Sequence, residues 1–179
     1  MYIHGSVGKF LQETASKQPW RGGIYNRGVL HLQPVKALTA RDLFERTISY
    51  ELATAVLEQA GGKGCPLWLR EAYAVYHCGE IANLTAPYGV TLTSFSDLDQ
   101  DIQQYRVPPQ RNDVHFILGH TMKFLIESFG EAKAWGVFKQ FNGMATLDDV
   151  FKKSFNQDFS TIEKSWSAYI GSQTGRLPK

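Results

Sequence analysis

The sequence has little net charge, few cysteines and no long apolar run, and each shortage narrows the range of functions. Its 19 basic and 17 acidic residues leave a formal net charge of +2, and the two signs are interspersed along the chain. Proteins that bind nucleic acid or anionic membranes concentrate basic residues in one region, so we expect neither partner. No apolar run approaches the roughly 20 residues that span a bilayer, so we expect no membrane span.

The two cysteines, Cys65 and Cys78, are expected to be free thiols. They bracket a predicted helix whose length of about ten residues, at 1.5 Å each, holds them about 15 Å apart. A disulfide needs Cα atoms within about 7 Å of each other. Free thiols do not indicate a compartment, and the first residues carry no signal-peptide pattern. The residues themselves therefore leave the localisation open.

What the chain does have is enough apolar sequence for a folded core. Hydrophobic residues make up 43% of the 179 residues and charged residues 20%, which is typical of a globular protein. Strand patterns occur at 2–4 and in a hairpin around the turn 26–28, and helix patterns follow. We predict an α+β fold in which a small N-terminal sheet or hairpin packs on a mainly helical body. With no repeat and no clear boundary, one domain is expected over residues 1–179.

Capping residues predict where the helices begin. Ser6 is expected to cap a helix over 7–17, and Thr39 with Asp42 to form a capping box for the first central helix. Pro108-Pro109 is expected to break the chain before a helix over 112–129, and a further helix is expected over 131–141. Three more caps are predicted: Ser96 for a helix to about 104, Thr146 for 147–155, and Ser160 with Glu163 for the last helix to about 170.

Two central helices carry the motifs with chemical content. The first contains Tyr50-Glu51-Leu52-Ala53-Thr54, and the second, opened by Pro66 after a glycine-rich loop, contains Trp68-Leu69-Arg70-Glu71-Ala72. Residues four apart lie about 40° from each other around a helix, so Tyr50 and Thr54 share a face. Either motif alone occurs by chance, and their order and spacing carry the information.

This order resembles the gluzincin-type zinc metallopeptidases, the peptidase MA-like domains, in which a helix with H-E-x-x-H precedes a helix with W-L-x-E-G/A. The resemblance covers most of the chain: a strand-containing part over 1–36, the two motif helices over 37–80 and a helical tail over 81–170. It implies that Tyr50 and Thr54 stand in place of two zinc-binding histidines, Glu51 at the general-base position and Glu71 at the third-ligand position. It also favours an extracytoplasmic location.

The residues at these positions are poor zinc ligands. A tyrosine ligates only when deprotonated, and its reference pKa is about 10; zinc prefers imidazole or thiolate. His115 and His120, five apart and so about 140° around a helix, do not face one ion together. We therefore expect no zinc and no other cofactor. One of these two histidines is expected to point into a possible cleft. Trp68 is another candidate residue of that cleft, although a position in the core is favoured for it.

The leading hypothesis is a catalytically inactive peptidase-like domain with a binding or structural role. Its cleft would be an open groove lined by Glu51 and Glu71 that accepts a peptide or protein. One alternative is an active metal-dependent hydrolase with rearranged ligands, and another is an interaction module that uses the helical tail. Tyr50 and Thr54 are also compatible with ordinary packing. Because two carboxylates without a metal need partners, we predict that Tyr50 or Thr54 donates a hydrogen bond to Glu71.

Overall fold

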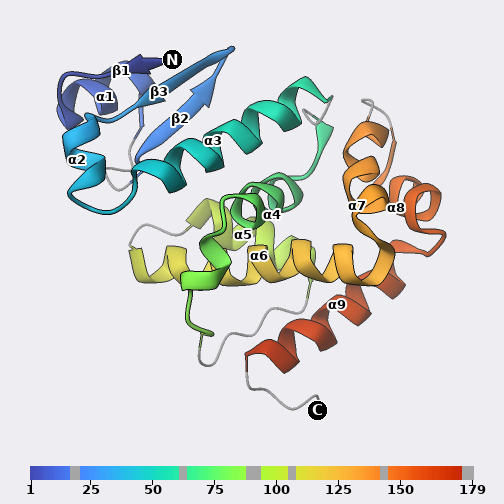
Figure 1. Ribbon diagram of the computed structural model, residues 1–179. Coiled ribbons are helices and arrows are strands. Elements are labelled where there is room, and N and C mark those ends of the chain that lie inside the picture. The colour runs from blue at the N-terminus through green and yellow to red at the C-terminus, as the bar shows by residue number, and fades with distance from the viewer. Residues whose placement is uncertain (17–20, 61–63, 88–93, 105–107, 142–144, 175–179) are drawn as a thin grey trace.

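The computed structural model describes residues 1–16, 21–60, 64–87, 94–104, 108–141 and 145–174. A small sheet with its covering helices lies at one end of a helical body (Figure 1). The sheet region contains β1 (Tyr2–Ile3), α1 (Val7–Thr14), β2 (Gly23–Asn26), β3 (Val29–Leu32) and α2 (Val35–Thr39). The body contains α3 (Phe44–Gln59), α4 (Leu67–His77), the 3-10 helix η2 (Glu80–Asn83), α5 (Phe95–Gln104), α6 (Pro108–Phe129), α7 (Glu131–Gly136), the 3-10 helix η3 (Val137–Gln140), α8 (Leu147–Phe155) and α9 (Phe159–Gln173). This is the predicted α+β arrangement.

The sheet is mixed, with the strand order β1-β3-β2. β1 runs parallel to β3, and β2 and β3 form an antiparallel hairpin. Arg27 and Gly28 in its turn have positive φ angles of 49° and 82°, which a two-residue loop of type I′ needs at both positions. The hairpin predicted around this turn is confirmed. β2 is an edge strand, and the helix beside it is α3 (Figure 1).

The entry to α3 differs from the predicted capping box. Thr39 is the last residue of α2, and Asp42 has a left-handed φ of 54°. The Leu43 amide donates to the Leu38 carbonyl at 2.9 Å, and the Asp42 amide donates to the Thr39 carbonyl at 3.0 Å. These two bonds form a Schellman motif, which ends a helix. The prediction of a helix start at Thr39 was therefore wrong, and α3 begins at Phe44.

The start of α5 also differs from the prediction, because Ser94 and not Ser96 is its cap. The Asp97 amide donates to Ser94 Oγ at 3.1 Å, and the Ser94 amide donates to Asp97 Oδ2 at 2.9 Å. A further first-turn amide, that of Phe95, donates to Glu163 of α9 at 2.8 Å. A carboxylate distant in the sequence thus satisfies a helix N-terminus.

This contact explains why the capping box predicted for the last helix was wrong. Glu163 caps α5 instead of its own helix. α9 begins at Phe159, one residue before Ser160, and the Phe159 amide donates to Asp148 of α8 at 3.0 Å. The local pattern Ser-x-x-Glu is present, but the glutamate points to a neighbouring helix that sequence spacing does not indicate.

Other predicted boundaries hold or shift by a few residues. Ser6 caps α1 and Thr146 forms a capping box at α8, as predicted. α1 ends at Thr14 instead of residue 17. α6 already begins at Pro108, because proline is tolerated in the first turn of a helix, where its missing N–H has no intrahelical partner. The single helix expected over 131–141 is instead α7 followed by η3.

The main core lies around α4, which packs between α3 and α6 (Figure 1). Three aromatic rings stack through it: Trp68 on Phe95 with centroids 4.0 Å apart, and Phe95 on Trp166 at 4.3 Å. The Trp166 indole N–H donates to Thr121 Oγ1 at 2.8 Å, which satisfies a buried donor. The stack joins α4 to α5 and α9, and the Trp166 hydrogen bond joins α9 to α6.

Cys65 and Cys78 are both free, as predicted. Within the described ranges, no helix has the length and apolar character needed to cross a bilayer.

Candidate functional site

The pairing of α3 with α4 brings Tyr50 and Glu71 together. Tyr50 lies in the middle of α3, and Glu71 lies near the start of α4. The Tyr50 hydroxyl donates a hydrogen bond to Glu71 Oε2. A bond to Glu71 from Tyr50 or Thr54 was predicted from the sequence, and the structure confirms it for Tyr50. Both side chains are half-buried, so the bond is shielded from water in part.

Thr54 makes a different contact. Its hydroxyl donates to the Tyr50 carbonyl at 3.1 Å, one turn earlier in the same helix. Such a bond satisfies the hydroxyl locally. Of the two candidate donors, Tyr50 is therefore the one that reaches Glu71.

Glu51 points to the sheet. Its Oε2 accepts from the Tyr25 amide of β2 at 2.7 Å, and its Oε1 lies 3.5 Å from the Arg21 guanidinium. Arg21 Nε also donates to the Gly23 carbonyl at 3.0 Å. A carboxylate and a guanidinium thus satisfy backbone groups along the outer edge of β2. Only 2% of the Glu51 surface is exposed.

Burial has the largest effect on Glu51, and it raises the pKa of the carboxyl group above its ordinary value of 4.5. The charge of Arg21 and the hydrogen bond from the Tyr25 amide oppose this shift, whereas the negative charge of Glu71 adds to it. The protonated form of the Glu51 carboxyl group is therefore favoured more strongly in the folded chain than in the unfolded one.

Close packing of β2 on α3 encloses Glu51. A Cβ atom added at Gly23 would lie 2.8 Å from Thr47 Cγ2, 2.9 Å from Leu32 Cδ2 and 3.2 Å from Glu51 Cγ. Glycine at this position lets the strand approach the helix. The expectation of an open groove lined by Glu51 and Glu71 is thus wrong for Glu51, which is covered by the strand.

His115 extends the network from the other side of Tyr50. Its ring lies parallel to the Tyr50 ring, with centroids 6.1 Å apart. His115 Nδ1 lies 2.9 Å from Glu80 Oε2, and Glu80 Oε1 lies 3.7 Å from the Arg46 guanidinium. Both His115 and Glu80 are buried. The Tyr50 network therefore connects α3, α4, η2 and α6.

Two members of this network, Arg46 and Glu80, were not predicted. Arg46 lies one turn before Tyr50 on α3, but an arginine at that spacing is usual on a solvated helix face. Glu80 follows Gly79 in a short 3-10 helix, where no periodic pattern indicates burial. The sequence carries no signal that pairs these residues.

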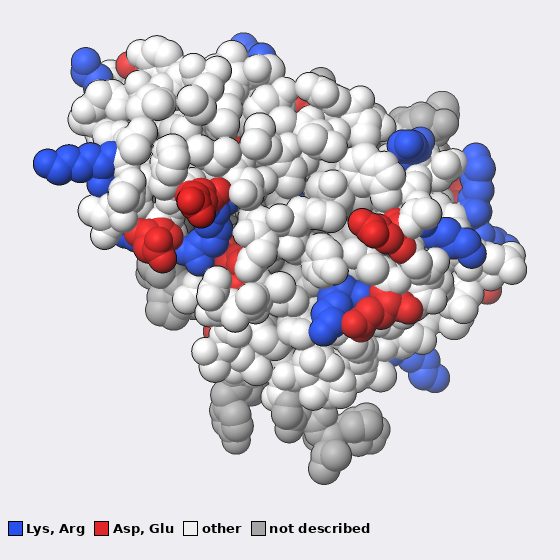
Figure 2. Space-filling view, viewed as in Figure 1, with Lys and Arg blue, Asp and Glu red and all other residues white. Residues whose placement is uncertain are grey.

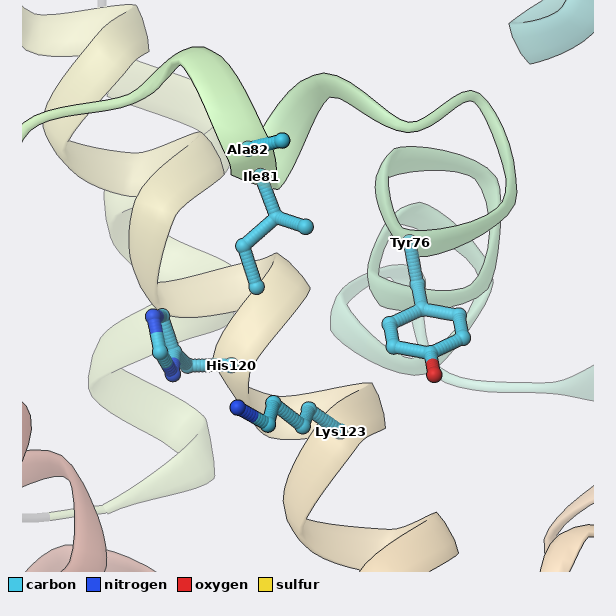
Figure 3. Close-up of a pocket in the computed structure, with 5 residues that line it drawn as sticks. All are labelled: Tyr76, Ile81, Ala82, His120 and Lys123. Carbon is cyan, nitrogen blue, oxygen red and sulfur yellow. The ribbon is translucent and has the colours of Figure 1, made fainter.

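The remaining predicted site residues lie elsewhere. Trp68 is 1% exposed and belongs to the aromatic stack of the core, so its assignment to a cleft was wrong. His120 Nδ1 lies 3.3 Å from the Tyr169 hydroxyl of α9, and His120 lines a separate pocket with Tyr76 and Lys123 (Figure 3). His115 and His120 thus occupy different sites, as their spacing predicted.

The described part of the face seen in Figure 2 carries no large patch of one charge. Acidic and basic side chains are interspersed over the visible surface, and much of it carries neither charge (Figure 2). Among the described side chains, no three histidine, cysteine, aspartate or glutamate groups converge with the geometry of a metal site.

A family model described as the peptidase MA superfamily matches residues 1–172. The chain belongs to the peptidase MA superfamily. Comparisons with curated proteins and with solved structures gave no match. The match spans the sheet region and the helical body as far as residue 172 in α9. It does not by itself assign an activity to the residues at the site.

Proposed function

We propose that this member of the peptidase MA superfamily is catalytically silent and that its former zinc site has a structural role. The observation that supports this is the hydrogen bond from the Tyr50 hydroxyl to the Glu71 carboxylate. In the gluzincin arrangement, Tyr50 and Thr54 replace the two motif histidines, and Glu71 corresponds to the third ligand. The tyrosine then provides the carboxylate with a partner in place of a metal ion.

The donor set at these positions does not fit zinc. Catalytic zinc sites use three protein ligands, mostly imidazole and carboxylate. Here a neutral phenol and a neutral hydroxyl accompany one carboxylate, and the Thr54 hydroxyl is already bonded to the Tyr50 carbonyl. Deprotonating a phenol with an ordinary pKa of about 10 opposes metal binding at neutral pH. No reaction step through a metal follows from these residues.

The contacts of Glu51 further support a structural role. A general base must reach the water or substrate from which it takes a proton. Glu51 instead uses both oxygens within the protein, on the Tyr25 amide and on Arg21. We infer that its function is to join β2 to α3.

No observation favours a rearranged metal site. Such a site would need histidines beside Glu71. The ring of His115 is near Tyr50, but its Nδ1 is engaged by Glu80. His4 and His31 lie 3.2 Å apart, nitrogen to nitrogen, in the sheet region. The hydrolase alternative therefore has no assembled ligand set among the described residues.

An interaction module based on the helical tail is not favoured either. Among the described residues, the large apolar side chains that are exposed lie in the N-terminal region and on α3, where Leu52 and Val56 are 52% and 47% exposed. The tail after residue 81 has none of this class in its described part. A structural role for the Tyr50–Glu71 contact remains the best supported proposal.

The proposal is tested by the metal content of the tag-free protein after incubation with zinc and desalting. Elemental mass spectrometry is expected to find far less than one zinc per chain, and Glu71→Ala is expected to leave that value unchanged. About one zinc per chain that disappears in Glu71→Ala would overturn the proposal and identify Glu71 as a ligand.

A further inference from the structure

A pocket lies beside η2, next to the Tyr50 network but distinct from it. η2 supplies Glu80 to that network, and the two residues that follow it face the pocket instead. The pocket has a volume of about 520 Å³ and opens to solvent. Its walls come from three elements (Figure 3): Tyr76 of α4, Ile81 and Ala82 of η2, and His120 and Lys123 of α6.

The apolar part of this pocket is built by close packing of η2 on α6. A Cβ atom at Gly119 would lie 3.2 Å from three side-chain atoms of Ile81, so the glycine lets Ile81 approach the helix. Ile81 and the Tyr76 ring then lie on two sides of the open space (Figure 3). A ligand between them would contact an aliphatic and an aromatic surface.

Among the described residues that line the pocket, Lys123 is the one that carries a charge. Its ammonium is 3.7 Å from Glu127, but the side chains are 41% and 54% exposed. Exposed pairs of this kind contribute little to stability, so the pair competes weakly with a ligand. In Figure 3 the Lys123 side chain extends along the floor of the pocket toward His120.

His120 is a neutral part of that floor at neutral pH. Burial lowers the pKa of its imidazole most, and the nearby Lys123 charge lowers it further, against a smaller opposite effect of Glu127. The positive charge of Lys123 thus outweighs the negative charge of Glu127 at this position. Among the described residues that line the pocket, the Lys123 ammonium is thus the group with which an anion would pair.

We propose that this pocket binds a small carboxylate that carries an apolar body. The carboxylate would pair with the Lys123 ammonium, and the apolar body would lie between Tyr76 and Ile81. Small pockets of this kind combine an apolar lining with a few polar groups that orient the ligand. A free organic acid and the C-terminal residue of a peptide share this chemistry. The proposal does not depend on whether the Tyr50–Glu71 site is silent.

The test is a titration followed by amide chemical shifts, with N-acetyl-L-leucine and its neutral amide as matched probes. The acid is expected to shift amides near Tyr76, Ile81 and Lys123, and the amide probe is expected to bind at least roughly tenfold more weakly. Equal binding of the two probes, or no shift with either of them, would overturn the proposal.

Variants locate the binding site. Lys123→Met keeps most of the side-chain stem but removes the charge, so binding of the acid is expected to be lost. Lys133→Met removes an exposed charge from α7, outside the pocket, and is expected to bind like the original chain. If Lys123→Met binds the acid unchanged, the proposal is wrong.

Short peptides distinguish the two sources of the carboxylate. A peptide ending in leucine with a free C-terminus is compared with N-acetyl-L-leucine, and its amidated form is the control. Tighter binding of the free peptide identifies a peptide C-terminus as the ligand, whereas weaker binding identifies a small acid.

Discussion

Tyr50 connects the two motif helices through one hydroxyl group. Removing it in Tyr50→Phe leaves the Glu71 carboxylate without that donor while preserving the ring. A hydrogen bond to a charged group contributes about 1.5–3 kcal/mol, and partial exposure of both side chains reduces this. We expect the free energy of unfolding to fall by about 1–2 kcal/mol, as measured by urea denaturation.

Tyr2→Phe is the matched control for this change, because Tyr2 is 49% exposed on the sheet. It is expected to alter stability by less than about 0.5 kcal/mol. Equal effects of Tyr50→Phe and Tyr2→Phe would show that the Tyr50–Glu71 bond does not stabilise the fold.

Glu51 makes stability depend on pH in a direction set by its buried carboxyl group. Its folded pKa is raised above 4.5 mainly by burial. The resulting stability is present below the unfolded pKa and is lost as pH rises through the folded pKa. Glu51→Gln removes this titration. Relative to the original chain, the variant should therefore become more stable as pH rises from about 4 to about 8.

Denaturation of both proteins across this range measures the difference. The raised pKa of Glu51 would be contradicted if the difference in free energy of unfolding between the two proteins stays constant with pH. It would also be contradicted if the original chain gains stability relative to Glu51→Gln as pH rises.

The residue-scale contacts differ in how far the sequence predicts them. Tyr50 and Thr54 lie on one helix face because of helix geometry, and a carboxylate without a metal needs a donor, so a bond to Glu71 was predictable. That Tyr50 and not Thr54 is the donor was not predictable. The short Thr54 side chain bonds to the backbone of its own helix instead. The Glu51 side chain points toward β2 because of how the sheet packs on α3, and the spacing of residues along the sequence does not specify that packing.

Among the secondary-structure elements, helix N-termini satisfied by distant carboxylates are a recurring feature. The Phe95 amide of α5 donates to Glu163 of α9, whereas Ser160, the locally predicted cap, is exposed and lies inside its helix. Glu163→Ala is expected to lower the free energy of unfolding by about 1 kcal/mol, the usual value for a lost helix cap. Ser160→Ala should cost less than about 0.5 kcal/mol.

Thermal or urea denaturation of these two variants shows which contact stabilises the protein more, the bond from the Phe95 amide to Glu163 or a local cap at Ser160. If Ser160→Ala proves the more damaging, the local capping box forms in solution and the contact between α9 and α5 does not have the role assigned here.

Helix and strand identities were more predictable than helix ends. The hairpin was predicted because two strand patterns flank the turn at residues 26–28, and α4 was predicted from its start at Pro66. Thr39 and Asp42 were misread because the same polar residues suit the start of one helix and the end of another. The Schellman bonds that decide between them involve Leu38 and Leu43, which also pack together in the sheet region's core.

In the whole molecule, β2, α3 and α4 form one connected unit around the site. Glu51 and Arg21 satisfy the outer edge of β2, Tyr50 connects α3 to α4, and His115 with Glu80 continues the contacts to α6 and η2. Superfamily membership was predictable from the order of motifs over most of the chain. The contact of Glu51 and Arg21 with the outer edge of β2 was not predictable, because it is a tertiary contact.

We propose that the chain keeps the peptidase fold but has lost its metal ligands. The most direct measurement is zinc affinity by titration calorimetry in the original chain and in the double variant Tyr50→His/Thr54→His. Two histidines four apart, with Glu71 as a third ligand, complete a zinc donor set. We expect the double variant to bind one zinc, to lose that binding when Glu71→Ala is added, and the original chain to bind none. Stoichiometric zinc in the original chain, or none in a folded double variant, would contradict this proposal.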